Sequence, residues 1–218
     1  MSGREAMLAR IREALRVPSH HAPASTASMC EVLPAVEDGW EQLVVSFRDN
    51  AKQLKAEFVV EPSVEAAMQR IADLAREASW TKVLSHRGGP AEQVASALSL
   101  PVLWAEDRSD KHEAAQCEAS VTGCEALVAQ TGSVLVSAHS AGGRTPSVLP
   151  WHHVVVATRG QLVADLPAAF ERIKDAGAGD TSSFYSLVTG PSRTGDIERV
   201  LVLGAHGPAR LTIVLVDV

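Results

Sequence analysis

Apolar residues recur along the first half of the chain with two alternating spacings. Helical spacing of three and four residues covers 40–54, 64–75 and 91–98, which predicts three helices. Short β-branched or apolar runs at 57–61, 82–85 and 101–104 predict a strand after each of them. Strands that alternate with helices of this length are typical of an α/β fold. We therefore expect a mostly parallel central sheet with helices on both faces.

The pattern changes after residue 123. Two apolar runs, 126–130 and 133–138, are separated only by Thr131 and Gly132, too few residues for a crossover helix. This spacing predicts a hairpin, so part of the fold is expected to be antiparallel. Helices are also predicted over 110–118 and over 166–173, the latter capped by Asp165, and strands over 154–157, 184–189, 200–203 and 211–218.

The N-terminal segment differs in composition from the rest. Ser2 and Glu5 form a capping-box pattern, and Met7, Leu8, Ile11 and Leu15 share one helical face. Residues 17–36 are rich in Pro, Ser and Ala without an apolar period, which predicts a flexible linker. We expect two parts: an N-terminal helix and linker (1–36) and an α/β domain (37–218). The helix is expected to pack on its own domain, or alternatively on another subunit.

Charge and cysteine usage exclude several classes of protein. A net charge of −6 offers no basic field for nucleic acid or an anionic membrane, and the charged N-terminus is unlike a signal peptide, so we expect a cytoplasmic protein. Cys30, Cys117 and Cys124 lack the spacing of an iron–sulfur motif. No GxGxxG follows the early strands, so no bound nicotinamide is expected. His152 and His153 are adjacent and would face opposite sides of a strand, so we expect no metal site there.

The strongest candidate site follows the predicted strand 184–189. Hydroxyl groups, a guanidinium and backbone N–H groups are concentrated there, and such groups at the carboxyl end of a parallel strand favour an anionic ligand. The predicted binding residues in this stretch are Gly190, Ser192, Arg193, Thr194 and Asp196.

Candidate proton-transfer groups lie in the same stretch. Glu198 and His206 are candidate general bases, although a histidine on a turn more often holds the turn together. Arg144, which follows two glycines farther upstream, is suited to a carboxylate and is expected to line the same cleft as Arg193, with a solvated loop cation as the alternative. Thr131, Gly132 and Ser133 are either turn residues or part of the same ligand site.

Four motifs resemble one known family. TGSVLVS, GRTPSVLPWHHVVV, TGPSRTGDIE and LVLGAHGP occur in family order and resemble the LUD-domain family, specifically its lactate utilization C branch. The resemblance implies a fold similar to sugar-phosphate isomerases and CoA transferases (NagB/RpiA-like). It also implies a role in oxidising L-lactate to pyruvate beside iron–sulfur partner proteins, which would hold the redox centres. The family usually has ETGT where this chain has Gln130 before Thr131, so a carboxylate role at that position is absent.

Two other functions remain open. One is a stand-alone isomerase or transferase acting on a sugar phosphate or CoA ester, with Glu198 or His206 as base. The other is a non-catalytic ligand-sensing or assembly subunit that uses the N-terminal helix. The sequence leaves it uncertain whether the chain is an enzyme.

Overall fold

The computed structural model describes residues 3–16, 36, 39–107, 110–175, 182–197 and 200–218. The chain divides into two compact units, residues 1–33 and 34–218. The first unit contains helix α1 (Gly3–Ala14), which has no buried residues. Met7 and Ile11 on this helix and Leu15 just after it are exposed. Apart from residue 36, the predicted linker lies outside the described residues.

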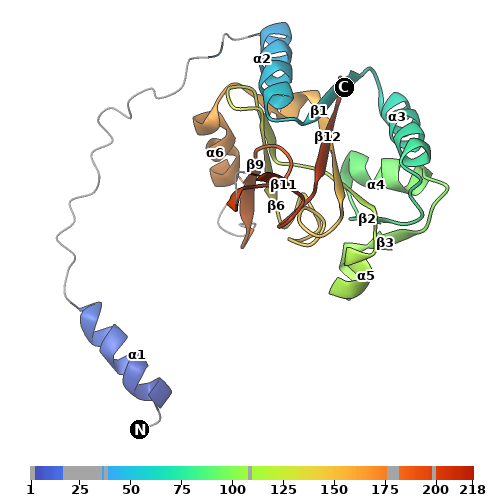
Figure 1. Ribbon diagram of the computed structural model, residues 1–218. Coiled ribbons are helices and arrows are strands. Elements are labelled where there is room, and N and C mark those ends of the chain that lie inside the picture. Colours follow the sequence, from blue (N-terminus) through green and yellow to red (C-terminus); the bar gives the residue numbers. More distant parts are fainter. Residues whose placement is uncertain (1–2, 17–35, 37–38, 108–109, 176–181, 198–199) are drawn as a thin grey trace. The chain divides into compact units, whose positions relative to one another are not determined.

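A six-stranded, wholly parallel sheet forms the centre of the second unit (Figure 1). Its strand order is β1 (Glu57–Glu61), β12 (Arg210–Val216), β7 (His152–Thr158), β4 (Ala119–Thr122), β2 (Val83–Ser85) and β3 (Val102–Trp104). Strand β12 lies between β1 and β7 and is buried from Leu211 to Val216. This confirms the prediction of an interior strand at the C-terminus, made from its unbroken apolar run.

Helices cover both faces of this sheet, as predicted. Helices α3 (Val64–Glu77) and α4 (Gly89–Ala97) pack against the face that carries Val121, Val154 and Val214. Helix α2 (Trp40–Gln53) packs against the opposite face through Phe47 and Ala51. Three short helices lie in the connections of this sheet, namely η1 (Ala105–Asp107), α5 (Lys111–Ala115) and η2 (Arg159–Gln161). No helix in the described part of the chain is long and apolar enough to cross a membrane.

A smaller sheet of four strands packs beside α2. Its order is β8 (Leu162–Val163), β5 (Ala126–Val128), β6 (Ser133–Ser137) and β9 (Tyr185–Val188). Strands β5 and β6 form the predicted antiparallel hairpin. Helix α6 (Leu166–Asp175) covers this sheet and is capped by the predicted Asp165, whose carboxylate accepts the Ala168 N–H at 2.9 Å. Strands β10 (Arg193–Ile197) and β11 (Val200–Leu203) form a separate antiparallel ribbon.

Two predicted elements differ in the structure. The helix predicted over 110–118 ends at Ala115, and Ala119–Thr122 forms strand β4, which the sequence did not indicate. Four residues buried on both faces are too short and too uniform to show a period of two. The strand predicted over 184–189 lies in the smaller sheet, paired antiparallel with β6, and not in the parallel sheet. The segment after it therefore does not lie at the carboxyl edge of the parallel sheet.

Candidate functional site

Two of the predicted motifs meet where β6 begins and β9 ends. Because these strands are antiparallel, Ser133 at the start of β6 lies beside Thr189 just after β9. Their hydroxyl oxygens are 2.9 Å apart, although the residues are 56 positions apart in the sequence. Tertiary structure thus joins the turn of Thr131, Gly132 and Ser133 to the segment that begins at Thr189.

Both motifs pack through a glycine, one against the C-terminal half of α2 and the other against the residue that caps this helix. Gly132 has φ 67°, and a Cβ there would lie 2.8 Å from the backbone nitrogen of Ala51. Gly190 has φ 87°, and a Cβ there would lie 2.8 Å from the carbonyl oxygen of Leu54. Each position combines a left-handed backbone with a close approach, so no other residue fits either position without displacement.

Asn50 on α2 holds the turn of the β5–β6 hairpin in place. Its side-chain amide donates to the carbonyl oxygens of Ala129 at 2.8 Å and of Gln130 at 3.1 Å. We expect Asn50→Asp, which keeps the size but removes both donors, to lower the free energy of unfolding by about 1–3 kcal/mol. Urea denaturation measures this, with exposed Gln53→Ala on the same helix as the control. Equal midpoints for both variants would contradict a supporting role for Asn50.

The turn that contains His206 lies beside Ser192. The Ser192 N–H donates to the Pro208 carbonyl at 2.8 Å, and the Gly204 N–H donates to the Ser192 carbonyl at 3.0 Å. The next residue, Arg193, begins β10, and its guanidinium is next to Gly190. We call this connected set the motif surface. It joins predicted site residues to their neighbours Thr189 and the His206 turn, and comprises Thr131, Gly132, Ser133, Thr189, Gly190, Ser192, Arg193 and residues 204–208.

The remaining predicted residues either lie away from the motif surface or have side chains that the structure does not describe. Thr194 and Asp196 are in β10, but their side chains are not among the described ones. Glu198 also lies outside the described residues. Arg144 is on the loop after the other end of β6, where its guanidinium stacks 5.1 Å from the centre of the Phe184 ring. The structure therefore separates Arg144 from Arg193, which the sequence had grouped in one site.

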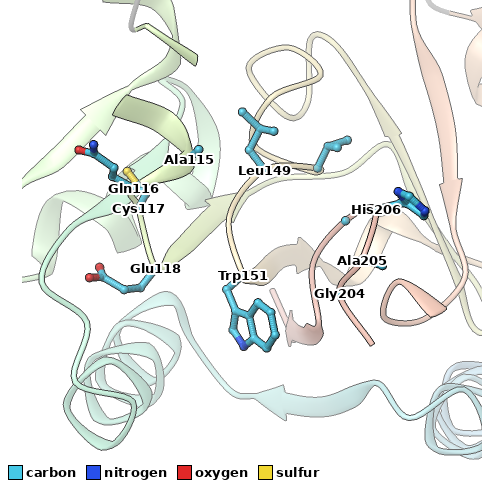
Figure 2. Close-up of a pocket in the computed structure, with 11 residues that line it drawn as sticks. Ala115, Gln116, Cys117, Glu118, Leu149, Trp151, Gly204, Ala205 and His206 are labelled. Carbon is cyan, nitrogen blue, oxygen red and sulfur yellow. The ribbon is translucent and has the colours of Figure 1, made fainter. Parts of the chain in front are cut away.

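A groove of about 550 Å³ opens beside the motif surface, at the amino ends of β4, β7 and β12. Figure 2 shows Glu118 and His206 on opposite sides of this amino-edge groove, with Trp151 between them. Trp151 is 59% exposed, and a Cβ on Gly204 would lie 3.0 Å from its ring. Sequence reasoning missed Trp151 because a tryptophan before a buried strand normally indicates core. Its neighbour Pro150 was the available signal that the strand had not yet begun.

The titratable groups around the groove differ in whether they can accept a proton or a hydrogen bond from a ligand. Burial tends to raise the pKa of Glu118, but hydrogen bonds from Thr81 and from the Thr81 and Lys82 N–H groups lower it overall. Burial raises the pKa of the Cys117 thiol to about 11. Neither group is therefore ready to accept a proton at neutral pH. His206 is exposed, and none of its described neighbours bonds its ring, so its imidazole is available to a ligand.

Arg193 offers a positive charge on the same surface. It is exposed, and no acidic side chain pairs with it among the described residues. A guanidinium is suited to binding a carboxylate through two parallel hydrogen bonds. The accessible part of the motif surface therefore combines the Arg193 guanidinium, the Thr189 and Ser192 hydroxyl groups and the His206 imidazole, the groups that would bind a small organic acid. The hydroxyl groups of Thr131 and Ser133 are buried beneath it.

Comparisons with known proteins identify the family of this chain. The LUD domain family model matches residues 44–216. The chain is 27% identical to Lactate utilization protein C of Shouchella clausii, over 81% of this chain and 80% of that protein. It is 34% identical to Lactate utilization protein C of Bacillus licheniformis, but that match spans 48% of this chain and 44% of that protein. The Deinococcus radiodurans protein of the same name is 30% identical over 62% of each chain.

A solved structure supports the fold. The crystal structure of a DUF162 family protein from Deinococcus radiodurans superimposes with a TM-score of 0.63, covering 83% of this chain and 99% of that one. At 21% identity this likeness concerns the fold alone. The family match, in contrast, extends from the middle of α2 to the end of β12, almost the whole α/β unit. The chain therefore belongs to the LUD domain family.

Proposed function

We propose that this protein takes part in lactate utilization in the cytoplasm, by binding a small organic acid at the motif surface beside redox partner proteins. The observation that carries the proposal is the connected, accessible surface of Ser192, Arg193 and His206. The shared name of its relatives, Lactate utilization protein C, supports the choice of pathway.

Each group on the motif surface has a role in this proposal. Arg193 binds the carboxylate of lactate or pyruvate, because it is an exposed guanidinium without an acidic partner among the described residues. Ser192 stands next to it and donates a hydroxyl hydrogen bond. His206 accepts a proton from the ligand's hydroxyl group, since its imidazole is accessible from the groove.

Electron transfer is assigned to iron–sulfur partner proteins. The three cysteines lack cluster-binding spacing. Cys117 and Cys124 are also buried, and burial raises the pKa of both thiols, whereas a cluster needs thiolates. Oxidation of lactate to pyruvate releases two electrons and two protons. The partners would accept both electrons, His206 the hydroxyl proton and solvent the proton from Cα.

Ligand binding to the purified protein tests the proposal. We expect L-lactate or pyruvate to raise the thermal unfolding midpoint, because a ligand that binds only the native state stabilises it. Arg193→Gln should weaken binding by about tenfold or more, the usual effect of losing a charge-assisted hydrogen bond. Arg144→Gln is the matched control, since it removes an exposed arginine away from the motif surface. Equal losses in both variants, or no shift with either acid, would contradict the proposed site.

The size of the groove favours a second candidate function. About 550 Å³ with an exposed Trp151 face is more than a three-carbon acid fills. A stand-alone isomerase or transferase acting on a sugar phosphate or CoA ester would use this space, with His206 as base. The same thermal screen should include these compounds. Turnover that persists in His206→Gln would exclude His206 as the base.

A further inference from the structure

A second cleft opens at the opposite edge of the parallel sheet. After β2 the chain passes through α4 to β3 on one side, whereas after β4 it continues into β5 and the smaller sheet. When the connections of two neighbouring parallel strands diverge in this way, a crevice forms between the carboxyl ends of the strands. Proteins of the α/β class commonly bind ligands in such a crevice. Here the crevice is a cleft of about 800 Å³.

This carboxyl-edge cleft is distinct from the motif surface. The loop of residues 138–143, which follows β6, forms part of its wall. Ser133 at one end of β6 belongs to the motif surface, while Ser137 at the other end is next to this loop. Four residue steps along a strand separate the two serines by about 14 Å. Neither Arg193 nor His206 lines the cleft.

His86 fixes the walls of the cleft. Its Nε2 accepts the Gly123 N–H at 3.0 Å, so its Nδ1 must carry the proton that is donated to the Arg87 carbonyl at 2.9 Å. A Cβ on Gly142 would overlap the His86 Cβ, so the 138–143 loop packs directly on this ring. The ends of β2 and β4 and the loop are thus held together through one neutral histidine, and the cleft is formed before any ligand arrives.

The charge in the cleft differs from that of the motif surface. Arg87 is already paired with Asp107 through two hydrogen bonds of 2.8 and 2.9 Å. Glu106 and Glu125 also line the cleft. Glu106 lies 3.7 Å from the same Arg87 guanidinium and accepts the Arg87 N–H at 3.0 Å, whereas Glu125 accepts the Ser137 hydroxyl at 2.5 Å. Among the described residues that line the cleft, the negative charge of the carboxylates therefore exceeds the positive charge that remains available to bind a ligand. A free carboxylate or phosphate would be repelled.

Backbone groups at the start of α4 are also partly occupied. The Gly88 N–H donates to the Glu92 carboxylate at 2.7 Å, and Pro90 has no N–H. This leaves less capacity for an anion than a helix N-terminus usually offers. Positions Gly89 and Gly143 have nothing within 4 Å of an added Cβ, so a ligand can approach the backbone there.

We infer that the carboxyl-edge cleft is a second binding site, for an uncharged or cationic organic ligand that donates hydrogen bonds to Glu125. This inference does not depend on the proposed lactate site, because the two share no residue. The ligand class follows from a preformed cavity whose acidic groups outnumber its available cations.

Backbone NMR of the full chain tests the inference with defined probes. Ethanolamine, as its cation, and D-ribose serve as probes of the cleft, and L-lactate and inorganic phosphate serve as anions. We expect ethanolamine or ribose to shift the amide resonances of Gly123 and Gly143. The inference is overturned if neither shifts them, or if the anions shift them at lower concentration. Lactate effects at Arg193 or His206 report separately on the proposed function.

A charge-removing substitution tests the role of Glu125. Glu125→Gln keeps an oxygen that accepts the Ser137 hydroxyl, so the fold should be retained. We expect it to weaken ethanolamine binding by about tenfold, since a nearby opposite charge is lost. Exposed Glu77→Gln on α3 is the matched control and should leave binding unchanged. Unchanged binding in Glu125→Gln would refute the assigned contact.

Discussion

Lowering the pH from 6.5 to 4.5 should reduce the free energy of unfolding by about 4 kcal/mol through two buried histidines. Burial lowers the pKa of His152 to about 4, with a further contribution from Arg210. Burial, together with His152, lowers the pKa of His153 to about 3. In the unfolded chain both rings would titrate near pH 6.5. The stabilisation is therefore complete above pH 6.5 and is lost as pH falls, because the unfolded state takes up protons first.

The hydrogen bonds explain why these rings stay neutral. His153 Nε2 bonds the Thr122 hydroxyl at 2.8 Å, and His152 Nε2 bonds the Thr212 hydroxyl at 2.8 Å. In each ring Nδ1 is buried and has no protein partner. A second proton on Nδ1 would place a positive charge where no acceptor meets it.

Urea denaturation at a series of pH values measures the effect. His153→Gln keeps a donor for Thr122 but does not titrate, so the pH dependence should fall by about half, from roughly 2.7 to 1.4 kcal/mol per pH unit. His139→Gln replaces an exposed histidine and should leave the slope unchanged. A wild-type slope in His153→Gln would show that His153 is not held neutral by the fold.

Gly142→Ala should destabilise the protein by about 2–4 kcal/mol, more than the same change at Gly143. Both glycines have positive φ, 65° and 108°. At Gly142 an added Cβ would overlap His86 and lie 3.1 Å from the Ala105 Cβ, whereas at Gly143 it would meet nothing within 4 Å. Gly143→Ala should therefore cost only backbone strain, about 1–2 kcal/mol.

Thermal and urea unfolding of the two variants measure this difference. Amide exchange at Gly123 gives a second readout, because displacement of His86 would break its bond to the Gly123 N–H. We expect faster exchange in Gly142→Ala and little change in Gly143→Ala. Equal destabilisation with unchanged exchange would mean that the loop does not rest on His86.

Local pattern was sufficient for most of the fold. Helical periodicity predicted α2 and α3, and the unbroken apolar run at the C-terminus predicted β12. The hairpin β5–β6 followed from the length of its turn. Strand β4 was not predictable, because four residues buried on both faces carry no period. The place of β9 was not predictable either, because strand pairing depends on partners distant in sequence.

The candidate site residues could be chosen from the sequence, but their positions in space could not. Thr131, Ser133, Ser192, Arg193 and His206 were identified from turn residues and motif content. The α2 glycine contacts and the Ser133–Thr189 bond then brought them together. Arg144 and Arg193 were grouped in one site, but the structure places them at opposite ends of β6. Two glycines predict a flexible loop, but they do not predict toward which part of the fold the loop extends.

Residue types and their spacing were thus enough for the helices, most strands, the α/β class and the polar groups of the motif surface, since these depend on neighbours within a few positions. Strand order, the amino-edge groove with Trp151 and the carboxyl-edge cleft under His86 were decided only by the folded chain. These features arise from contacts between residues tens of positions apart, such as His86 with Gly123. The free energy of such contacts comes from packing and hydrogen bonds that no local pattern contains.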